Sequence, residues 1–442
     1  MRTLRTHLRA AACVALLASP GAITAQATTA LAAAERSITS SVDKHNAEAL
    51  ALLERLVNIN SGTLNFAGVR QVGDVLRTEF DALGFTTRWV DGAGFKRAGH
   101  LVAEHKGSGP KIILIGHLDT VFEPSNPFQK FERLNDSTAK GPGIIDMKGG
   151  DVVMLFALRA LKDAGLLQNM NVTAVFNGDE EEAGEPLDAA RKALIDAAKG
   201  ASAALGFEDG AGDPKTAVIS RRSAGSWTLK TTGTPAHSGQ IFKPEVGAGA
   251  VYEASRILSA FYTQLSNEQY LTFNPGLAIG GTLVKVDSTG VEGSGAGKRN
   301  VVAGTMTVTG DLRTLSPEQH AKAMRTMKTI VSTHHLPKTS ATIEFDDGYP
   351  PMAPTQGNRR LLAMYDKASR DIGAGGVAAV DPSRAGAADV AFIASIVPMI
   401  IDGIGLSGHD DHSDKETADL RMLPSQTKRA ALVMYRLTRT VP

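Results

Sequence analysis

Residues 111–120 read KIILIGHLDT, and this stretch decides the fold class. Its first half, 111–115, is apolar except for one lysine, as in strands that are covered on both faces of a parallel sheet. A second apolar strand is expected at 172–177, and a helix is expected between the two strands at 150–164. Strands and helices that alternate in this way predict an α/β fold with a mostly parallel sheet.

The same pattern extends to both sides of this stretch. Apolar periodicity predicts further helices and strands of the α/β domain. The helices are expected at 41–59, 72–83 and 424–438, and the strands at 86–90, 100–104 and 397–401.

Between residues 221 and 349 the pattern changes. The expected elements are, in chain order, a strand at 226–232, a helix at 247–265, strands at 271–279 and 305–312, a helix at 317–334 and a strand at 342–346. The order strand-helix-strand-strand-helix-strand describes a ferredoxin-like α+β domain. We therefore expect a domain at 222–348 that is inserted in the α/β domain, which comprises 28–221 and 349–442. The glycine-rich segment 293–298 is expected to be a loop.

The charge balance excludes one class of partner. Of the 442 residues, 47 are Lys or Arg and 46 are Asp or Glu, which leaves a formal net charge of +1. Nucleic-acid binding depends on a basic surface that neutralises phosphates. The sequence therefore predicts no nucleic-acid partner.

Residues 1–27 have the pattern of a signal peptide. Arginines precede a short apolar run at 10–18, and Ala25 and Ala27 offer cleavage points. The run is shorter than the roughly 20 apolar residues that span a bilayer, and a buried N-terminal helix is the alternative. Cleavage would give a secreted or periplasmic protein without a membrane anchor. Because Cys13 is the only cysteine, the mature chain would have no thiol, and any metal site must consist of His, Asp and Glu.

His117 and Asp119 directly follow the strand at 111–115. Residues at i and i+2 of an extended chain project from the same side. Asp119 could therefore hold one ring nitrogen of His117 while the other nitrogen binds a metal ion. A purely structural hydrogen-bonded pair would leave the same pattern.

Further acidic segments are candidates for the same site. Asp146 lies in the turn GPGIIDMKGG at 141–150, where a helix N-cap without function is the alternative. Four acids at 179–182 repel one another, so they either form a solvated loop or bind a cation at the strand end where α/β sheets place ligands. The segments GFED at 206–209 and GHDDHSD at 408–414 complete the set. Oxygen and imidazole ligands alone suit zinc or a similar divalent ion.

The order of six motifs resembles that of the aminoacylase and carboxypeptidase G family of co-catalytic zinc peptidases. The motifs are GHLDTV, GPGIIDMKGG, FNGDEE, GFED, PAHSG and HSDKE, and the resemblance covers nearly the whole mature chain. It implies two Zn²⁺ ions bridged by Asp146. The ligands would be His117, Asp146 and Glu208 for one ion, and Asp146, Glu181 and His412 for the other.

The resemblance also implies roles for residues beside the metals. Glu180 would be the general base, and Asp119 would orient His117. The peptide bond after Asp146 would be cis.

The inserted domain would complete the site as a lid and dimerisation domain. The resemblance implies that His237 stabilises the oxyanion, often across the interface of a homodimer. Asn300 and Arg313 would hold the terminal carboxylate of the substrate. An arginine suits this task because its planar fork can bind both carboxylate oxygens.

The implied activity is metal-dependent hydrolysis of an amide or peptide bond. It would release a C-terminal amino acid from a small N-acyl or peptide substrate with a free carboxylate. Glutamate as the released residue rests on the resemblance to the carboxypeptidase G branch alone. The alternatives are an aminopeptidase or dipeptidase, and a relative that binds without catalysis.

Three assignments stay open in the sequence. A shift of one residue in the acidic run would make Glu181 the base and Glu182 the ligand. Asp209 competes with the preceding glutamate as a ligand. His409 is expected to lie outside the ligand set.

Overall fold

Strand β3 (Lys111–His117) lies inside the main sheet of the molecule. The computed structural model describes residues 31–440, so the expected signal peptide at 1–27, with Cys13, lies outside the described residues. The sheet has six strands in the order β1-β2-β6-β3-β7-β16. The other five are β1 (Thr86–Asp91), β2 (Gly99–His105), β6 (Asn171–Asn177), β7 (Ala203–Gly206) and β16 (Ile400–Ile401).

The direction of the strands confirms the expected α/β fold class. β6, β3, β7 and β16 are parallel to one another, while β1 and β2 form an antiparallel edge. The carboxyl ends of β6, β3 and β7 therefore meet at one edge of the sheet. In open α/β sheets this edge is where ligands bind.

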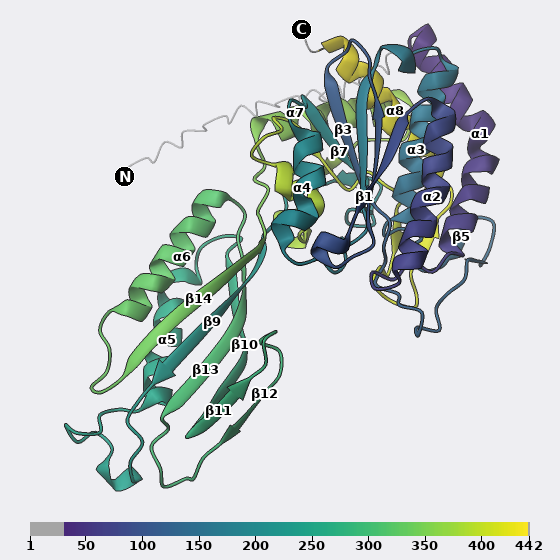
Figure 1. Ribbon diagram of the computed structural model, residues 1–442. Helices are drawn as coiled ribbons and strands as arrows, with labels where there is room; N and C mark the ends of the chain where they lie inside the picture. The colour runs from purple at the N-terminus through teal and green to yellow at the C-terminus, as the bar shows by residue number, and fades with distance from the viewer. Residues whose placement is uncertain (1–30, 441–442) are drawn as a thin grey trace, which may run out of the picture.

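Helices cover both faces of this sheet, which explains why 111–115 is apolar. Ile112 and Leu114 pack into the core beneath α1 (Ala33–Val57), α2 (Phe66–Leu83), α3 (Lys148–Asp163) and α8 (Met422–Thr440). Ile113 and Ile115 pack into a second core with α4 (Leu187–Ala198) and the 3-10 helix η5 (Asp389–Ile393). Burial of each such side chain contributes about 1.5–3 kcal/mol. Figure 1 shows the helices on either side of the strands.

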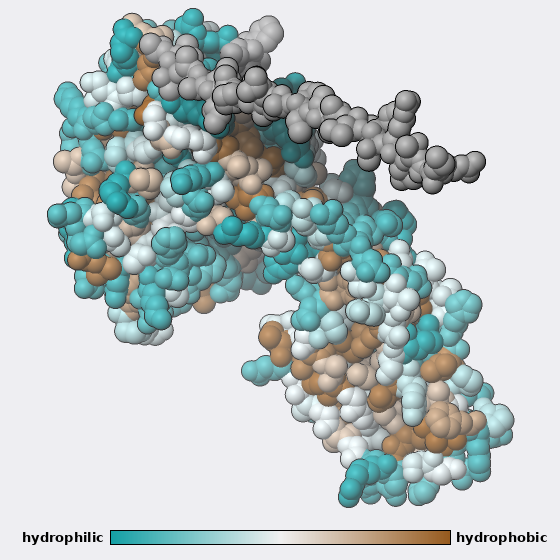
Figure 2. Space-filling model, turned by 180° about the vertical axis from the view of Figure 1, so that it is seen from behind, coloured by the Kyte–Doolittle hydropathy of each residue, from teal (hydrophilic) through white to brown (hydrophobic). Residues whose placement is uncertain are grey.

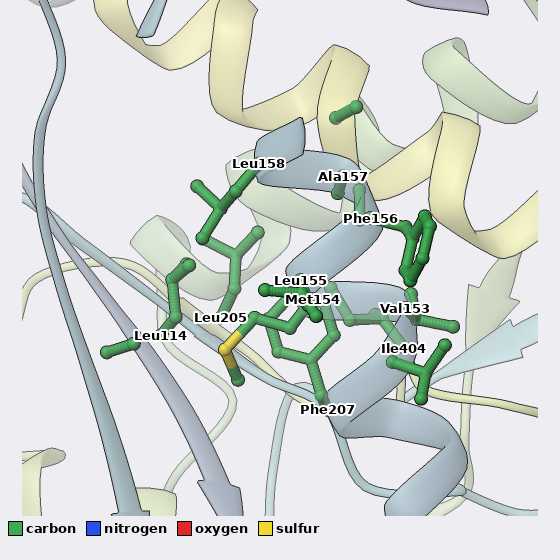
Figure 3. Packing of buried hydrophobic residues seen from close by; sticks show 14 of the residues in the cluster. Leu114, Val153, Met154, Leu155, Phe156, Ala157, Leu158, Leu205, Phe207 and Ile404 are labelled. Atoms are coloured by element: carbon green, nitrogen blue, oxygen red, sulfur yellow. The ribbon is translucent and has the colours of Figure 1, made fainter. Parts of the chain in front are cut away.

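Helix α3 is buried along nearly its whole length. Its residues 153–158 pack against Leu114 and Leu205 of the sheet and against Phe207 and Ile404, as Figure 3 shows. This packing fixes the start of α3 beside the carboxyl ends of β3 and β7. The polar turn that precedes α3 is therefore held at the ligand-binding edge.

A second lobe is formed by six elements after residue 223. They are β9 (Ala224–Thr232), α5 (Ala250–Leu265), β10 (Thr272–Gly281), β13 (Thr305–Arg313), α6 (Pro317–Ser332) and β14 (Ser340–Tyr349). The strands form an antiparallel sheet in the order β10-β13-β9-β14. Its core joins Trp227 and Leu229 of the sheet to Phe261 of α5 and Met327 of α6. The strand-helix-strand-strand-helix-strand order is that of the sequence prediction.

Within residues 31–440, the chain crosses between the lobes in two neighbouring segments. The chain leaves the first lobe at Arg221 and returns at Met352, and these two residues exchange backbone hydrogen bonds of 2.9 Å. Figure 1 shows the second lobe extending away from the six-stranded sheet, and Figure 2 shows the same division from behind.

The remaining elements are short, apart from α7 (Gln356–Asp371). One small sheet contains β17 (Gly408–His409), β18 (Thr417–Asp419), β5 (Thr138–Lys140) and β4 (Glu132–Arg133), and β8 (Thr216–Ala217) pairs with β15 (Ala378–Ala379). Besides η5, the 3-10 helices within residues 31–440 are η1 (Ala93–Phe95), η2 (Leu167–Asn169), η3 (Ser238–Gln240) and η4 (Pro382–Arg384). Within residues 31–440, no helix is both long and apolar enough to cross a membrane.

The glycine-rich segment differs from its prediction as a loop. Residues Gly293–Ala296 form strand β12, which pairs with β11 (Leu283–Val286). Pairing uses backbone groups, so a strand without apolar side chains gives no periodic signal. Glycine is needed at position 293, because a Cβ there would lie 2.6 Å from the backbone carbonyl oxygen of Lys285. The prediction of a loop at 293–298 was therefore wrong for its first four residues.

Candidate metal centre

Three parallel strands carry the acidic motifs to one place. β3 ends at His117, β6 ends at Asn177 shortly before Glu180, and β7 ends at Gly206 shortly before Glu208. Since β6, β3 and β7 are neighbours, the polar residues that follow them lie at the same edge. The sequence places these residues far apart, and the sheet brings them together.

Asp146 lies at the centre of this group. Its Oδ1 is 3.0 Å from Nε2 of His117, and its Oδ2 is 2.9 Å from Nε2 of His412. Nε2 of His412 is also 3.1 Å from Oε2 of Glu181, and Nε2 of His117 is 3.6 Å from Oε1 of Glu208. The two oxygens of Asp146 thus face two different sets of ligand atoms.

The N-cap alternative for Asp146 does not fit this geometry. Met147 is the N-cap of α3, and no side chain caps the helix. The peptide bond between Asp146 and Met147 is cis, as the family resemblance implied. Glu416, the glutamate of the HSDKE motif, holds the turn by accepting N–H bonds of 2.9 Å from Gly143 and Ile145 and of 3.2 Å from Asp146. Its role in the turn was not expected from the sequence.

Asp119 holds the acidic loop as well as the histidine. Its carboxylate accepts N–H bonds from Glu180 at 3.0 Å and Glu181 at 3.1 Å, and an O–H bond from Thr63 at 2.7 Å. Nδ1 of His117 lies 3.1 Å from the carbonyl oxygen of Asp119 and 3.5 Å from its carboxylate. Asp119 therefore orients the ring mainly through its backbone, and its side chain positions the acids.

The structure favours one register of the acidic run. Glu181 lies beside His412, and Glu180 lies beside His117 and Glu208 with ligand atoms within 4.8 Å of one another. Glu182 instead turns to the surface, where its carboxylate pairs with Arg97 at 2.8 Å. The additional acid in the run is thus removed from the site by a partner of its own.

The structure also bears on the choice between Glu208 and Asp209 as a ligand and on the place of His409. Among the described residues, Glu208 belongs to a group of potential ligands that Asp209 does not join. His409 is exposed, in agreement with its expected place outside the ligand set. Asp411, which sequence reasoning did not select, groups with Asp146 and His412. The motif GHDDHSD contained this signal, but nothing in it distinguishes Asp411 from Asp410.

The acids perturb one another strongly. Burial and the nearby Asp146 carboxylate raise the pKa of Glu181 to about 7. Hydrogen bonds to Asp146 and Glu181 raise the pKa of His412 to about 11. Burial raises the pKa of Glu180 and of Glu208 well above the usual range. A site in which carboxylates are forced to hold protons lacks positive charge.

The residues present fit divalent cations. Oε1 of Glu181 is buried and has no hydrogen-bond partner within the described chain, although buried polar atoms almost always have one. The potential ligands are carboxylates and imidazoles without a thiol, which is the donor set of hard or borderline divalent ions. Metal ions would satisfy the free oxygen and balance the negative charge.

The residues expected to bind substrate are not gathered at this site. His237 and Asn300 are exposed and adjacent, since Ser238 N donates to the Asn300 carbonyl oxygen at 2.9 Å. Arg313 pairs with Asp311 at 3.1 Å near the junction of the lobes. Across residues 31–440, no hydrogen bond or ion pair links these three residues to the acidic cluster.

Arg313 also lies far from the other two substrate candidates. β9 pairs with β13 so that Leu312 faces Gly225 and Thr305 faces Thr232. Arg313 is therefore at the junction end of the sheet. His237 comes after β9 ends at the opposite end of the sheet, and Asn300 comes before β13 begins there. The nine residues of β9 span about 30 Å. The expected Asn300 and Arg313 pair cannot contact one small carboxylate within a single chain in this conformation.

The comparisons with known proteins agree with the cluster. Residues 113–439 match the sequence profile of peptidase family M20/M25/M40. The chain belongs to this family. Carboxypeptidase G2 of Pseudomonas sp. (strain RS-16) is 30% identical over 392 residues, which cover 87% of this chain and 88% of that protein. This M20 peptidase is therefore a metallopeptidase that hydrolyses peptide or amide bonds.

Solved structures show the same fold. Aminopeptidase PepT of Bacillus cereus ATCC 10987 aligns with a TM-score of 0.70 at 18% identity, over 89% of this chain and 98% of its own. The YXEP protein of Bacillus subtilis, a dinuclear metal binding peptidase of the M20 family, aligns with a TM-score of 0.60 at 16% identity. That alignment covers 90% of this chain and 99% of the other.

Proposed function

We propose that this M20 peptidase is a di-zinc carboxypeptidase or N-acyl-amino-acid amidohydrolase. The observation that carries the proposal is the position of Asp146, whose two oxygens face His117 and His412 at 3.0 and 2.9 Å. One ion would be held by His117, Asp146 and Glu208, and the other by Asp146, Glu181 and His412. Asp411 is placed to assist the second ion.

The metal ions would supply electrostatic activation. When bound, two such ions polarise the scissile carbonyl and lower the pKa of the attacking water.

Glu180 is the residue we assign as general base. Its carboxylate groups with His117 and Glu208, and its backbone N–H is held by Asp119 at 3.0 Å. A carboxylate at this position can accept the proton of the attacking water and return it to the leaving amine.

The partly exposed Arg313 is an argument for a substrate with a free carboxylate. Its guanidinium is about one-third exposed and has Asp311 as its partner, so a substrate carboxylate can compete for it. The 30% identity to carboxypeptidase G2 supports release of a C-terminal amino acid, with glutamate as the first candidate.

An aminopeptidase or dipeptidase activity is the second candidate. It would need an acidic anchor for a free amine. Asp410 and Asp411 are exposed beside His412 and could provide that anchor. A non-catalytic relative is not favoured, because the proposed base and ligands are all present and assembled.

A hydrolysis screen of the metal-loaded protein tests the proposal. N-acyl amino acids, dipeptides and peptides with an amidated C-terminus are compared. We expect hydrolysis of N-acyl amino acids and loss of hydrolysis when the carboxylate is amidated. Preference for a free N-terminus with indifference to the amidated end would instead establish an aminopeptidase.

We also propose that the protein is a secreted or periplasmic homodimer. Residues 1–27 support export. Residues 222–348 are the proposed dimerisation region, where β14 is an edge strand. Figure 2 shows hydrophobic residues on the surface of this lobe. Its exposed large apolar residues are Phe242, Val251, Tyr252, Tyr262, Leu283 and Val291. A second copy would explain how His237 and Asn300, far from the junction, reach a metal centre.

A further inference from the structure

A buried arginine lies behind the acidic loop. Arg191 of α4 is fully buried, and its guanidinium donates to carboxylate oxygens of Asp179 and of Asp389 at 2.7 Å each. It also donates to the carbonyl oxygen of Asp179 at 3.0 Å and to the hydroxyl oxygen of Tyr349. None of these residues is a proposed metal ligand.

Tyr349 connects this arginine to the proposed base. Its hydroxyl donates to the carbonyl oxygen of Glu180 at 2.9 Å. The direction of both bonds is fixed, because a guanidinium can only donate and a carbonyl can only accept. The ring packs on Phe392 with centroids 4.9 Å apart, so the hydroxyl has little freedom to leave this position.

The peptide group between Glu180 and Glu181 is therefore held at both ends. Its N–H, which belongs to Glu181, donates to Asp119 at 3.1 Å, and its C=O accepts from Tyr349 at 2.9 Å. The proposed base and a proposed metal ligand flank this peptide group. Because the peptide group is planar, rotation of the group would break both bonds and turn both carboxylates.

Tyr349 also belongs to the junction of the two lobes. It is the last residue of β14 and pairs with Ala224, the first residue of β9. The second lobe is therefore attached to the first through a residue that contacts the catalytic loop. A change in the angle of the lobes would act on the Glu180 carbonyl through the Tyr349 hydroxyl.

We propose that Tyr349 is a positioning residue for the reaction, which couples the attachment of the second lobe to the orientation of Glu180. This inference rests on the proposed function of Glu180 as the base. Arg191 fixes the hydroxyl of Tyr349, and Tyr349 fixes the peptide group that carries the base.

Tyr349→Phe is the variant that isolates this role. It removes the hydroxyl but keeps the ring against Phe392. Variants of Arg191 are less suitable, because they would leave Asp179 and Asp389 buried without their partner and could prevent folding. Tyr365→Phe is the matched control. Tyr365 is more deeply buried than Tyr349, lies with its ring centroid 6.0 Å from the guanidinium carbon of Arg429 and belongs to α7.

The test combines kinetics with amide hydrogen exchange. For Tyr349→Phe we expect kcat to fall about 10- to 100-fold, since small misplacement of a reacting group costs up to about 100-fold in rate. KM should stay within about twofold of wild type, since the hydroxyl makes no proposed contact with substrate. Exchange should become faster in 179–184, with metal content and circular dichroism unchanged, and Tyr365→Phe should behave as wild type.

Each other outcome has a definite meaning. An unchanged kcat or unchanged exchange in 179–184 overturns the inference. A fall in kcat that matches a loss of bound metal or of folded protein also overturns it, because the tyrosine would then be structural only. If wild type hydrolyses no substrate in the screen, the proposed function fails. The exchange comparison then still decides whether Tyr349 holds the loop.

Discussion

Each of the four carboxylates in the acidic run 179–182 has a different partner, and the partner determines its proposed role. Asp179 is bound by Arg191, Glu180 lies beside His117 and Glu208, Glu181 lies beside His412, and Glu182 pairs with Arg97. The chemical type of the side chains is nearly the same. Their function is decided by burial and by the charges around them.

Replacing the base should separate catalysis from metal binding. Glu180→Gln removes the proton acceptor but keeps the shape of the side chain. We expect turnover to fall by about two to four orders of magnitude, the range found for a lost general base. Steady-state kinetics and metal analysis of the same sample check this. Loss of metal with the activity would show that Glu180 is a ligand instead.

Replacing Glu181 should instead reduce metal binding. Glu181→Gln replaces a carboxylate that lies 3.1 Å from His412, and we expect it to lower the metal content from two ions to one per chain. Glu182→Gln is the matched control, because its side chain is exposed and paired with Arg97. Metal lost from the Glu182 variant but kept in the Glu181 variant would mean that the register is shifted by one.

At the scale of elements, the sequence predicted those segments whose side chains carry a periodic signal. β3 alternates between two cores, and α2 ends where Gly84 adopts φ 96°, so both were found from apolar spacing and glycine. β12 was missed because its residues are small and its pairing is made by the backbone.

In the site, too, the sequence predicted only those residues that lie in a recognisable pattern. The motifs pointed to the proposed ligands because they combine several acids and histidines. Arg191 and Tyr349 are single residues in otherwise ordinary segments. Glu416 lies in the HSDKE motif, but no sequence signal links it to the turn at 143–146. The fold brings all three residues to the cluster. Their positions depend on long-range contacts that no local pattern encodes.

Helix α5 contains a buried acid that should control the stability of the second lobe. Glu253 accepts bonds from Arg256 at 2.6 Å, His335 at 2.9 Å and the Leu336 N–H at 2.9 Å. Although burial opposes ionisation, these bonds lower its pKa to about 2. The ionised form is thus favoured in the folded state. Its contribution to the free energy of unfolding is present above about pH 4.5 and is lost as the pH falls towards 2.

We therefore expect Glu253→Gln to lower the Tm at pH 7, with a smaller difference from wild type at pH 3. The exposed β14 residue Glu344, changed to Gln, is the control. Calorimetry at both values checks this. A difference in Tm that is constant or grows as the pH falls would contradict the assignment.

At the scale of the whole molecule, the two lobes hold different parts of one proposed site. The metal centre lies at the edge of the first sheet, and His237 lies beyond the far end of the second. If two copies share their sites, each would combine a metal centre of one chain with His237 of the other.

Mixed dimers test this sharing. Glu180→Gln and His237→Ala should each be nearly inactive as homodimers. After the two variants are unfolded and refolded together, half of the dimers are mixed, and each mixed dimer has one intact site. We expect recovery of about a quarter of wild-type activity. No recovery, while sedimentation shows that mixed dimers form, would place His237 in the site of its own chain.

The central claim is that Asp146 bridges two metal ions, and anomalous diffraction from a crystal grown with zinc measures this most directly. A difference map at the zinc edge should show two peaks about 3.5–4 Å apart, one beside each carboxylate oxygen of Asp146. His117 and Glu208 should contact one peak, and Glu181 and His412 the other. A single peak, or two peaks of which neither contacts Asp146, would contradict the account.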